Sequence, residues 1–212
     1  MGNLVDDTVG AALLKRITEK DQKAFEEFYY LYAEGFGRFL MKMLKQHEWV
    51  DEAVNDVMLT IWQMADRYDP EKGRLSTWLF GIAHNKGLKI LERNGRCREE
   101  SLEDHDVEVD NNEELVDGSY GSAIPSNSEP ERVVMGWELG DAMSWAFGKL
   151  SPDHQVVIEL CFTEDFTYQE IADIIDCPLN TVKTRLFHAR KRLAKMLARK
   201  GFALSDQVKL EV

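Results

Sequence analysis

Residues 167 to 197 read TYQEIADIIDCPLNTVKTRLFHARKRLAKML and carry cations and hydrogen-bonding side chains at helical spacing. From Leu179 to Lys200 there are eight Lys or Arg and no acid. A helix that is merely solvated usually mixes both signs of charge, because opposite charges three or four residues apart attract one another. That compensation is missing here, so the pattern favours a surface for phosphates and base edges. The side chains expected to contact DNA are Asn180, Thr181, Lys183, Thr184, Arg185, His188 and Lys191.

A helix-turn-helix would position these side chains. Thr167 and Glu170 have the spacing of a capping box, which starts the first helix. Pro178 cannot donate a backbone hydrogen bond and ends that helix. A second helix is expected to start near Asn180 or Thr181, both of which are good N-caps. Its buried stripe would be Val182, Leu186, Ala189, Leu193 and Leu197.

A second candidate site lies in the turn-rich loop from Asp69 to Arg74 and in the helix that follows, for which Ser76 is the expected cap. Trp78 either stacks on a base or closes a small core. His84, Asn85, Lys86 and Lys89 are expected to project outward from this helix.

A third candidate surface runs along the helix expected from Asp51 to Tyr68. Its outer side mixes acid, amide and aliphatic groups, at Glu52, Asn55, Asp56 and Leu59. Such a strip is either solvated or a protein-binding face with an apolar centre and a polar rim. Composition leaves both alternatives open.

The remaining periodic segments are also helical, and no strand pattern occurs. Helices are expected at Val9–Ile17, after an N-cap at Asp21, at Val133–Gly148, and after Ser151. The helix after Asp21 carries an aromatic stripe that we interpret as core: Phe25, Phe28, Tyr29, Tyr32, Phe36, Phe39, Leu40 and Met43. The predicted fold class is all-α.

The net charge of −12 is concentrated in one segment. Residues 99 to 131 hold twelve of the 38 acids and no Lys or Arg, so the remaining acids equal the 26 Lys and Arg. This acidic segment, which has no periodicity, is expected to be a disordered linker. The predicted organisation is a helical domain at 1–97, the linker at 98–132, a helix-turn-helix domain at 133–200 and a tail at 201–212.

Several other classes of protein are not supported. No apolar run is long enough to span a membrane, and the first residues lack the pattern of a signal peptide, so a cytoplasmic protein is expected. Cys97, Cys161 and Cys177 match neither a disulfide framework nor a zinc site. Without a paired-carboxylate, nucleophile–base or phosphate-loop pattern, we expect no enzyme activity and no cofactor.

The two helical halves resemble the sigma-70 family of bacterial RNA polymerase initiation factors, specifically the extracytoplasmic-function (ECF) group, which keeps only regions 2 and 4. The resemblance covers roughly residues 20–97 and 133–198. In the second half, YQEIADIIDCPLNTVKTRL is similar to the group's Y-x-E-I-A…P-x-G-T-V-K-x-R-L pattern. Asn180 replaces the usual glycine and His188 the usual arginine.

The first half makes the resemblance specific. VDEAVNDVMLTIWQMADRYDPEKGRLSTWLFGIAHN resembles region 2, including its D-P-x-x-G and W-L-x-x-I-A-x-N segments. In this stretch Asn55 stands for glutamine, Met58 for phenylalanine and His84 for arginine.

The resemblance implies an ECF-type sigma factor whose partners are core RNA polymerase, through its largest-subunit coiled coil and its flap, and promoter DNA, with an anti-sigma factor as a further candidate. It implies that Glu52, Asn55, Asp56 and Leu59 bind polymerase and that the second helix of the helix-turn-helix binds the minus-thirty-five element. The residues implied for the minus-ten element are Tyr68, Lys72, Arg74, Ser76, Trp78, His84, Asn85 and Lys86. The alternative is a helix-turn-helix regulator that binds DNA as a dimer without polymerase.

Overall fold

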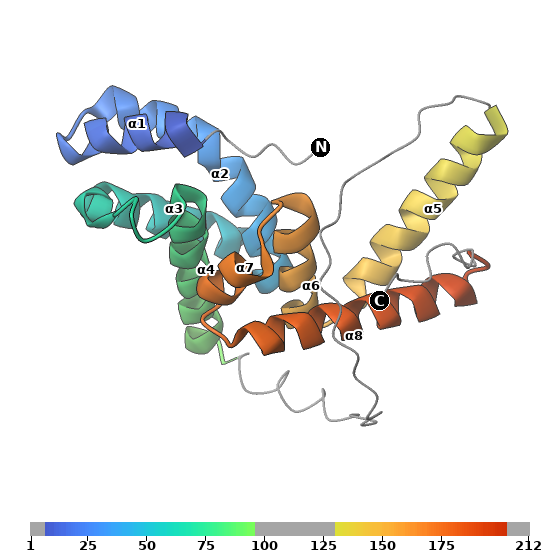
Figure 1. The fold of residues 1–212 in the computed structure, drawn as a ribbon. Coiled ribbons are helices and arrows are strands. Elements are labelled where there is room, and N and C mark those ends of the chain that lie inside the picture. Colours follow the sequence, from blue (N-terminus) through green and yellow to red (C-terminus); the bar gives the residue numbers. More distant parts are fainter. Residues whose placement is uncertain (1–6, 96–129, 203–212) are drawn as a thin grey trace.

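The computed structural model describes residues 7–95 and 130–202, and these ranges contain helices and no strand, which confirms the all-α prediction (Figure 1). Most of the predicted linker lies outside these ranges, as do residues 1–6 and the end of the tail. The first domain consists of α1 (Asp7–Thr18), α2 (Gln22–Leu44), α3 (His47–Met64) and α4 (Leu75–Arg93). The second consists of α5 (Pro130–Gly148), α6 (Pro152–Ile158), α7 (Tyr168–Ile174) and α8 (Leu179–Arg199). Because α5 begins at Pro130, it takes in the last three residues assigned to the linker.

The long helix α2 provides the centre of the first domain. Asp21 is its N-cap, as predicted, and its carboxylate accepts hydrogen bonds from the backbone N–H groups of Lys23 and Ala24. The aromatic stripe is mostly buried, with Phe28 and Phe36 fully inaccessible to solvent. Tyr29 departs from the prediction, because 38% of it is exposed. The stripe is wider than one helical face, so its edge reaches the surface.

Helices α3 and α4 cross α2 and differ from the prediction at their starts. α3 begins at His47, four residues before the predicted Asp51, and its last turn continues as a 3-10 turn at Ala65–Arg67. Ser76 does not cap α4, whose N-cap position is Arg74. The carboxylate of Asp7 instead accepts hydrogen bonds from the backbone N–H and the hydroxyl of Ser76, both at 3.2 Å. The start of α4 is therefore capped from α1, a distant part of the chain.

In the second domain the predicted capping box is present. The Thr167 hydroxyl accepts from the backbone N–H of Glu170, and the Glu170 carboxylate accepts from the backbone N–H of Thr167. Ser151 precedes α6 as predicted, but its hydroxyl contacts His154 Nδ1 at 2.9 Å and makes no cap bond. A π-helical turn at Glu159–Thr163 follows α6.

The N-cap of α8 lies two or three residues earlier than the predicted Asn180 or Thr181. Pro178 holds the N-cap position, and its carbonyl accepts from the backbone N–H of Thr181 at 2.9 Å. A proline suits this position, because its fixed φ favours the extended backbone of an N-cap and its carbonyl remains free to accept. The predicted stripe is correct: Val182, Leu186, Ala189 and Leu197 are buried and Leu193 is partly buried.

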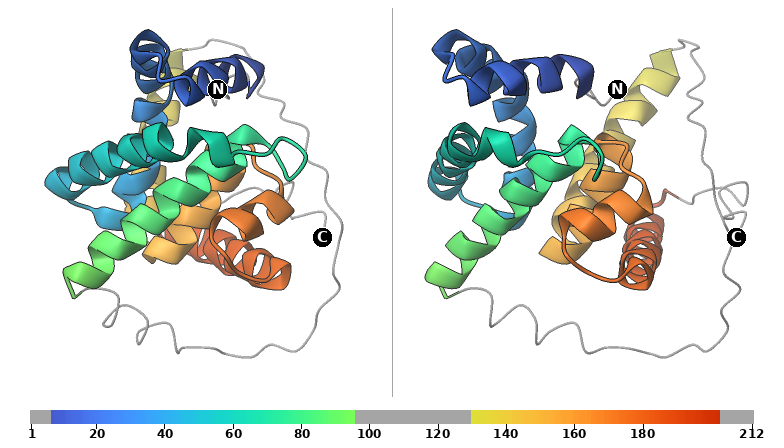
Figure 2. Two further views of the ribbon diagram at one scale, coloured as in Figure 1. Left: turned by 90° about the vertical axis from the view of Figure 1, so that its left-hand side faces the viewer. Right: turned by 60° about the vertical axis from the view of Figure 1, so that its left-hand side comes forward.

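The two domains pack against each other through one continuous hydrophobic core. Helix α4 lies beside α7, and α2 contacts α6, in both views of Figure 2. At the centre of this junction the rings of Phe80 and Phe166 lie with their centroids 5.2 Å apart. The sequence suggested two modules connected by a linker, and it contained no indication that they would share a core.

Candidate nucleic-acid interface

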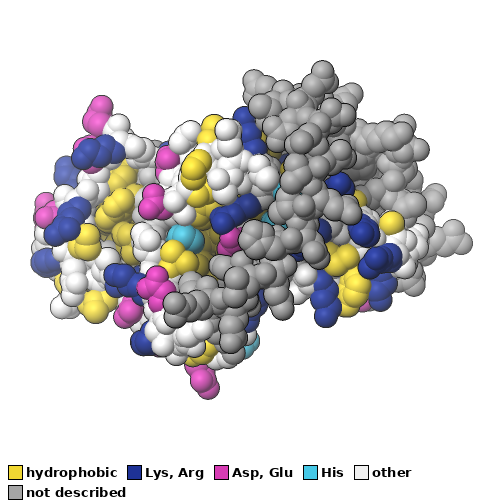
Figure 3. All heavy atoms as spheres, turned by 90° about the horizontal axis from the view of Figure 1, so that it is seen from below, with side chains coloured by type: hydrophobic (Ala, Val, Ile, Leu, Met, Phe, Trp, Pro, Cys, Tyr) yellow, Lys and Arg dark blue, Asp and Glu magenta, His cyan; other side chains and the backbone are white. Residues whose placement is uncertain are grey.

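The outer side of α8 presents the residues predicted to bind DNA. Asn180, Thr184, His188 and Lys191 are exposed, and Thr181 and Lys183 are partly exposed. They occupy the face opposite the buried stripe, because residues three and four apart share a side of a helix. Figure 3 shows Lys and Arg side chains gathered on the right-hand part of the face below α8. This arrangement has the charge and the shape of a helix that enters a major groove.

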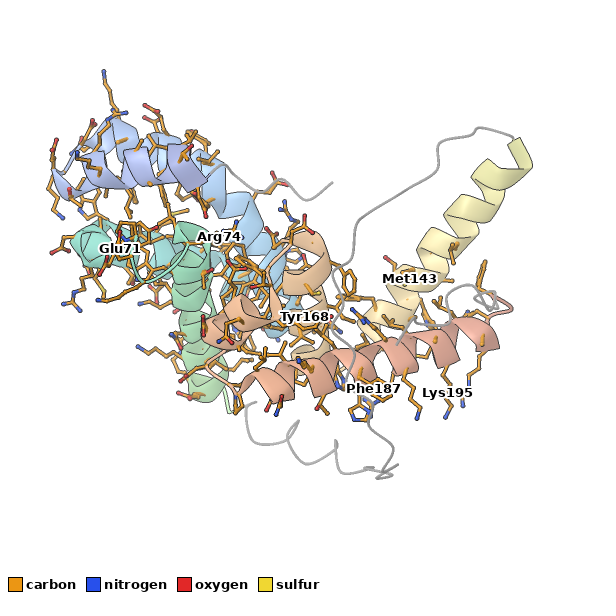
Figure 4. All side chains as sticks on the ribbon, in the orientation of Figure 1. Glu71, Arg74, Met143, Tyr168, Phe187 and Lys195 are labelled. Carbon is orange, nitrogen blue, oxygen red and sulfur yellow. The ribbon has the colours of Figure 1, made fainter. Side chains whose placement is uncertain are left out.

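Phe187 belongs to the same face and was not singled out from the sequence. It is 55% exposed and points away from the body of the protein, as Lys195 does in Figure 4. Its position three residues after Thr184 and four before Lys191 could have identified it. The Lys191 ammonium lies 6.0 Å from the centre of its ring. An exposed phenyl ring on such a face can contact the methyl group of thymine.

Arg185 differs from its neighbours on α8, because its side chain is directed toward α6 of the same domain. Its guanidinium forms an ion pair of 2.5 Å with Asp153 at the start of α6. This pair connects α8 to α6. Arg185 is therefore engaged within the protein, whereas His188 and Lys191 face outward.

The loop before α4 is held in place by local contacts. Tyr68 donates a hydrogen bond from its hydroxyl to the carbonyl of Gly73 at 3.2 Å, and its ring lies 5.6 Å from that of Trp78. Asp69 accepts from the backbone N–H of Glu71 and pairs with Lys72 at 3.3 Å, and these contacts lower the pKa of its carboxyl. Tyr68 and Trp78 are partly exposed at this loop.

Arg74 is engaged on two sides. Its guanidinium lies 3.1 Å from Asp7 of α1 and 3.3 Å from Glu170 of α7. It also lies 5.9 Å from the centre of the Phe166 ring. Ser76, which was predicted to contact DNA, is buried with 4% of its surface exposed. The start of α4 is thus enclosed by α1 on one side and by the second domain on the other (Figure 4).

His84 does not project outward as the sequence suggested. It is buried under the second domain, with 8% of its surface exposed. Burial lowers its pKa to about 4, and the nearby charges of Asp153, Arg185 and Asp176 have smaller effects. Its Nδ1 atom has no hydrogen-bond partner among the described residues. Of its neighbours, Asn85 is exposed and Lys86 is partly exposed.

The candidate strip on α3 is accessible, and it borders a hollow. Asn55, Asp56 and Leu59 are exposed, and Leu59 is 53% accessible. Glu52 is partly exposed and receives two hydrogen bonds of 2.7 Å from Arg93, which lower the pKa of its carboxyl. The hollow, of about 410 Å³, lies between α2 and α3 and is lined by Gln22, Phe25, Tyr29, Asn55, Met58, Leu59 and Trp62.

Two of the three aromatic residues of this hollow, Phe25 and Tyr29, were assigned to the core from the sequence. Tyr29 is instead 38% exposed in the hollow, whereas Phe25 is partly buried against the core and packs edge-on against Trp62, with ring centroids 5.1 Å apart. An exposed apolar centre beside acidic side chains is the composition expected of a protein-binding face.

Other kinds of site receive no support from the part of the chain described. Within residues 7–95 and 130–202 no group of His, Cys, Asp and Glu could hold a metal ion. Cys161 and Cys177 are both free thiols, and burial raises the pKa of each. None of the described helices is long and apolar enough to cross a membrane.

Comparison with known proteins finds two family models in this chain. The model described as Sigma-70 region 2 matches residues 32–97, and the model described as Sigma-70, region 4 matches residues 146–193. Together they cover more than half of the sequence. The first match includes α3, α4 and the loop between them, and the second includes α6, α7 and α8 as far as Leu193.

Individual proteins are similar over most of their length. The ECF RNA polymerase sigma factor RpoE of Cereibacter sphaeroides is 29% identical over 196 residues, which cover 91% of this chain and 97% of that protein. Among solved structures, CnrH in complex with the cytosolic domain of CnrY has a TM-score of 0.57 at 17% identity, with 90% of this chain and 98% of that chain covered. The sigma factor RpoE of Bartonella quintana, in complex with the anti-sigma factor NepR, has a TM-score of 0.55 at 22% identity, with 83% and 98% covered.

Proposed function

Because the chain belongs to the sigma-70 family, as an RNA polymerase sigma factor of the ECF group, we propose that its three surfaces bind core RNA polymerase and two promoter elements. The observation that carries this proposal is the presence, in one chain, of both a region 2 match and a region 4 match. A helix-turn-helix regulator that acts without polymerase would need only the second. The alternative therefore leaves the first domain without a purpose.

The outer face of α8 is the proposed minus-thirty-five surface. Thr184, His188 and Lys191 are its central side chains, and Asn180, Thr181 and Lys183 extend it toward the N-terminus of the helix. Hydroxyl, imidazole and ammonium groups can all donate to base edges or phosphates in a major groove. Arg185, which is paired with Asp153, can contribute only if that ion pair opens.

The loop from Tyr68 to Arg74 and the start of α4 are the proposed minus-ten surface. Tyr68 and Trp78 offer partly exposed aromatic faces for unstacked bases, and Lys72 and Arg74 offer charge for the backbone. Asn85 and Lys86 would extend this surface along α4. Ser76 and His84 are buried in the arrangement described, so their contribution also requires a change of arrangement.

The α3 strip and the adjoining hollow are the proposed polymerase surface. Glu52, Asn55, Asp56 and Leu59 would contact the coiled coil of the largest subunit, and the second domain would contact the flap. Acidic residues around an exposed leucine suit a partner helix with basic and apolar side chains.

Several further properties follow from the proposed function. The chain would carry no catalytic site and no cofactor, because core polymerase supplies the chemistry. It would act in the cytoplasm, where bacterial polymerase and DNA are found. The solved relative from Bartonella quintana is bound to an anti-sigma factor, and this supports an anti-sigma protein as a regulatory partner.

Reconstitution tests the proposal directly. The purified chain is mixed with core RNA polymerase and a library of bacterial promoter fragments, and the transcripts are sequenced. A sigma factor gives transcripts from a set of promoters with related elements near minus thirty-five and minus ten. Failure to co-purify with core polymerase, together with binding to a palindromic duplex as a dimer, would establish the regulator instead.

A further inference from the structure

Helix α1 is a part of the first domain that neither family match covers, since the region 2 match begins at residue 32. Its buried side carries Leu13, Leu14 and Ile17, which belong to the hydrophobic core. This packing explains why α1 folds onto α2, but it does not explain the polar contacts at the N-terminal end of α1. Those contacts lead to the loop between α3 and α4, which is part of the proposed minus-ten surface.

Asp7 is the first residue of α1, and its carboxylate holds the end of this loop. Its Oδ2 atom accepts hydrogen bonds from Nε of Arg74 at 3.1 Å and from the hydroxyl of Ser76 at 3.2 Å. Its Oδ1 atom accepts from the backbone N–H of Ser76 at 3.2 Å. Hydrogen bonds that involve an ionised group are the stronger ones in proteins. Asp7 therefore fixes the point at which the loop ends and α4 begins.

Helix α1 also lies near the start of the loop. The 3-10 turn at Ala65–Arg67, directly before Tyr68, packs against α1. Burial raises the pKa of the Tyr68 hydroxyl, and the negative charges of Asp7 and Asp69 raise it further. One helix thus contacts the chain on both sides of the loop from Asp69 to Arg74.

Gly10 allows α1 to approach the start of α4 closely. It is buried, and a Cβ atom at this position would overlap the hydroxyl of Tyr32 and lie 2.9 Å from Cδ2 of Leu75, the first residue of α4. A side chain at residue 10 would therefore move α1 away from its neighbours. Because Asp7 and Gly10 are three residues apart, they share one side of the helix, and the close contact at Gly10 keeps Asp7 within reach of Ser76.

The loop held in this way carries the aromatic side chains of the proposed minus-ten surface. Tyr68 precedes the loop and Trp78 follows it in the first turn of α4, and their ring centroids lie 5.6 Å apart. Stacking on unpaired bases tolerates every base, so selectivity requires hydrogen-bonding groups at fixed positions beside the stacked rings. A loop without a fixed conformation would retain charge and aromatic surface but would distinguish poorly between bases.

We propose that α1 determines base selectivity at the minus-ten element by holding this loop, with Asp7 as a positioning residue and Gly10 as the point of close contact. This role rests on the proposed function of the loop. Asp7 acts through Arg74 and Ser76 and needs no contact with DNA. Without it, the loop would adopt its binding conformation for only part of the time, and the affinity for the matching sequence would be reduced by that fraction.

Substitutions in α1 test this role in the complex with core polymerase. The variants are Asp7→Ala and Gly10→Ala, and the matched control is Asp21→Ala. Asp21 also caps a helix of the first domain and pairs with an arginine, Arg16, at 2.7 Å, so the control loses the same kinds of contact and the same charge as Asp7→Ala. It lies beyond the other end of α1, which is about 18 Å long.

The probe is a pool of single-stranded DNA with a randomised internal segment. DNA bound by the unaltered complex is sequenced to identify a preferred oligonucleotide and a mismatched one. Fluorescence anisotropy then gives the affinity of each complex for both, and the ratio of the two affinities measures selectivity.

The ratio should be about tenfold lower in Asp7→Ala than in the unaltered protein, because the loop would be correctly formed in only a fraction of molecules. Gly10→Ala should lower it in the same direction. The loss of one negative charge affects both oligonucleotides alike and cancels in the ratio. Asp21→Ala should leave the ratio unchanged, because partial unfolding lowers both affinities by the same factor.

Two results would overturn the proposal. One is an unchanged ratio in both Asp7→Ala and Gly10→Ala, which would show that α1 has no influence on selectivity. The other is an equal fall of the ratio in Asp21→Ala, which would attribute the effect to the stability of the whole domain.

Hydrogen exchange of the free chain tests the holding of the loop without DNA. Backbone amides from Tyr68 to Thr77 should exchange faster in Asp7→Ala than in the unaltered protein, whereas Asp21→Ala should leave them unchanged. Unaltered exchange in Asp7→Ala would refute the positioning role directly. An unaltered complex that selects no sequence from the pool would instead reject the minus-ten surface itself, whereas selection that persists in Asp7→Ala would reject only the role of α1.

Discussion

The two surfaces proposed to bind DNA differ in how accessible they are. The face of α8 around Thr184, His188 and Lys191 is exposed and is formed by one helix, whose buried stripe alone determines its orientation. The start of α4 packs against α1 and α7, where Ser76 is buried, and the 41% exposed side chain of Arg74 is paired with acids from both. The difference teaches that a surface formed by one helix face is oriented by that helix alone, whereas a surface at the start of α4 depends on segments distant in the sequence.

The largest expected effect is on binding to core polymerase, the proposed partner of the α3 strip. Glu52→Lys with Asp56→Lys should abolish co-purification with core polymerase, because both acids lie on the proposed binding strip. The fold should survive, since exposed charges contribute little to stability even though Glu52 loses its contact with Arg93. Affinity capture of core polymerase gives the result.

The control for that experiment is Glu19→Lys with Asp66→Lys, which changes the net charge equally at exposed positions away from the strip. Unchanged capture by the strip variant would remove α3 from the polymerase surface. Equal loss in both variants would attribute the effect to net charge alone.

The next effect tests the exposed surface. Alanine at Thr184, His188 and Lys191 together should weaken binding to a selected promoter duplex by about 100-fold or more, since each lost base contact costs about 1–3 kcal/mol. The fold should be retained, because all three side chains are exposed. Titration of the duplex at several salt concentrations measures the loss of binding, with Lys149→Ala as a control that also removes one cation.

A smaller effect is expected from pH, because protonation of His84 should change the equilibrium constant for separation of the two domains by about tenfold. Burial lowers the pKa of His84 to about 4 in the closed form, in which the two domains pack together. In an open form, in which the domains are separated, the pKa should return to about 6.5. Above pH 6.5 the imidazole is neutral in both forms and has no effect. As the pH falls from 6.5 toward 4, only the open form takes up the proton, so the closed form loses stability. At about pH 5.5 the shift amounts to roughly 1.4 kcal/mol.

Scattering measurements between about pH 7 and pH 5.5 would reveal this opening as an increase in the radius of gyration. The charges of Asp153, Arg185 and Asp176 also affect the pKa of His84, and their effects are smaller than that of burial. Glu164 acts in the opposite direction, because burial raises its pKa and its protonation therefore favours the closed form as the pH falls. In His84→Gln the opening should disappear, and an unchanged pH response would assign it to another group.

The smallest expected effect is on the free energy of unfolding, when the caps of α4 and α7 are removed one at a time. Asp7→Ala and Thr167→Ala should each lower the free energy of unfolding by about 0.5–2 kcal/mol, as the loss of a helix cap usually does. Asp7 caps α4 from a distance of 69 residues along the chain, whereas Thr167 caps its own helix. Hydrogen exchange should therefore increase at the start of α4 in the first variant and at the start of α7 in the second. Asp66→Ala, an exposed site, should change neither.

Features that depend on neighbouring residues could be predicted from the sequence. The Asp21 cap, the Thr167–Glu170 capping box and the buried stripe of α8 were all correct, because each is determined within one or two helical turns. The α3 strip was also correctly placed on the outer side of its helix. Periodicity identifies the apolar side of a helix. This is sufficient to predict which side chains are exposed when one side of the helix is buried and the other faces solvent.

Features that depend on distant residues could not be predicted. His84 and Ser76 are polar and lie outside the apolar stripe of α4, so the sequence suggested that both face outward or cap the helix. Their burial results from the docking of α1 and the second domain, which no local pattern encodes. The N-cap of α8 at Pro178 was missed for another reason. Asn180 and Thr181 are residue types that cap helices more often, but the backbone of Pro178 already has the extended conformation of an N-cap.

The contact between Arg74 and Glu170 spans 96 residues of sequence, and this separation has a consequence during synthesis on the ribosome. At roughly 5–20 residues per second, α7 is made about 5–20 s after Arg74. During that interval the nascent first domain has its helices but lacks the segment that covers α4. A growing chain would therefore expose Arg74 and Thr77 until α7 is made and Glu170 contacts both of them.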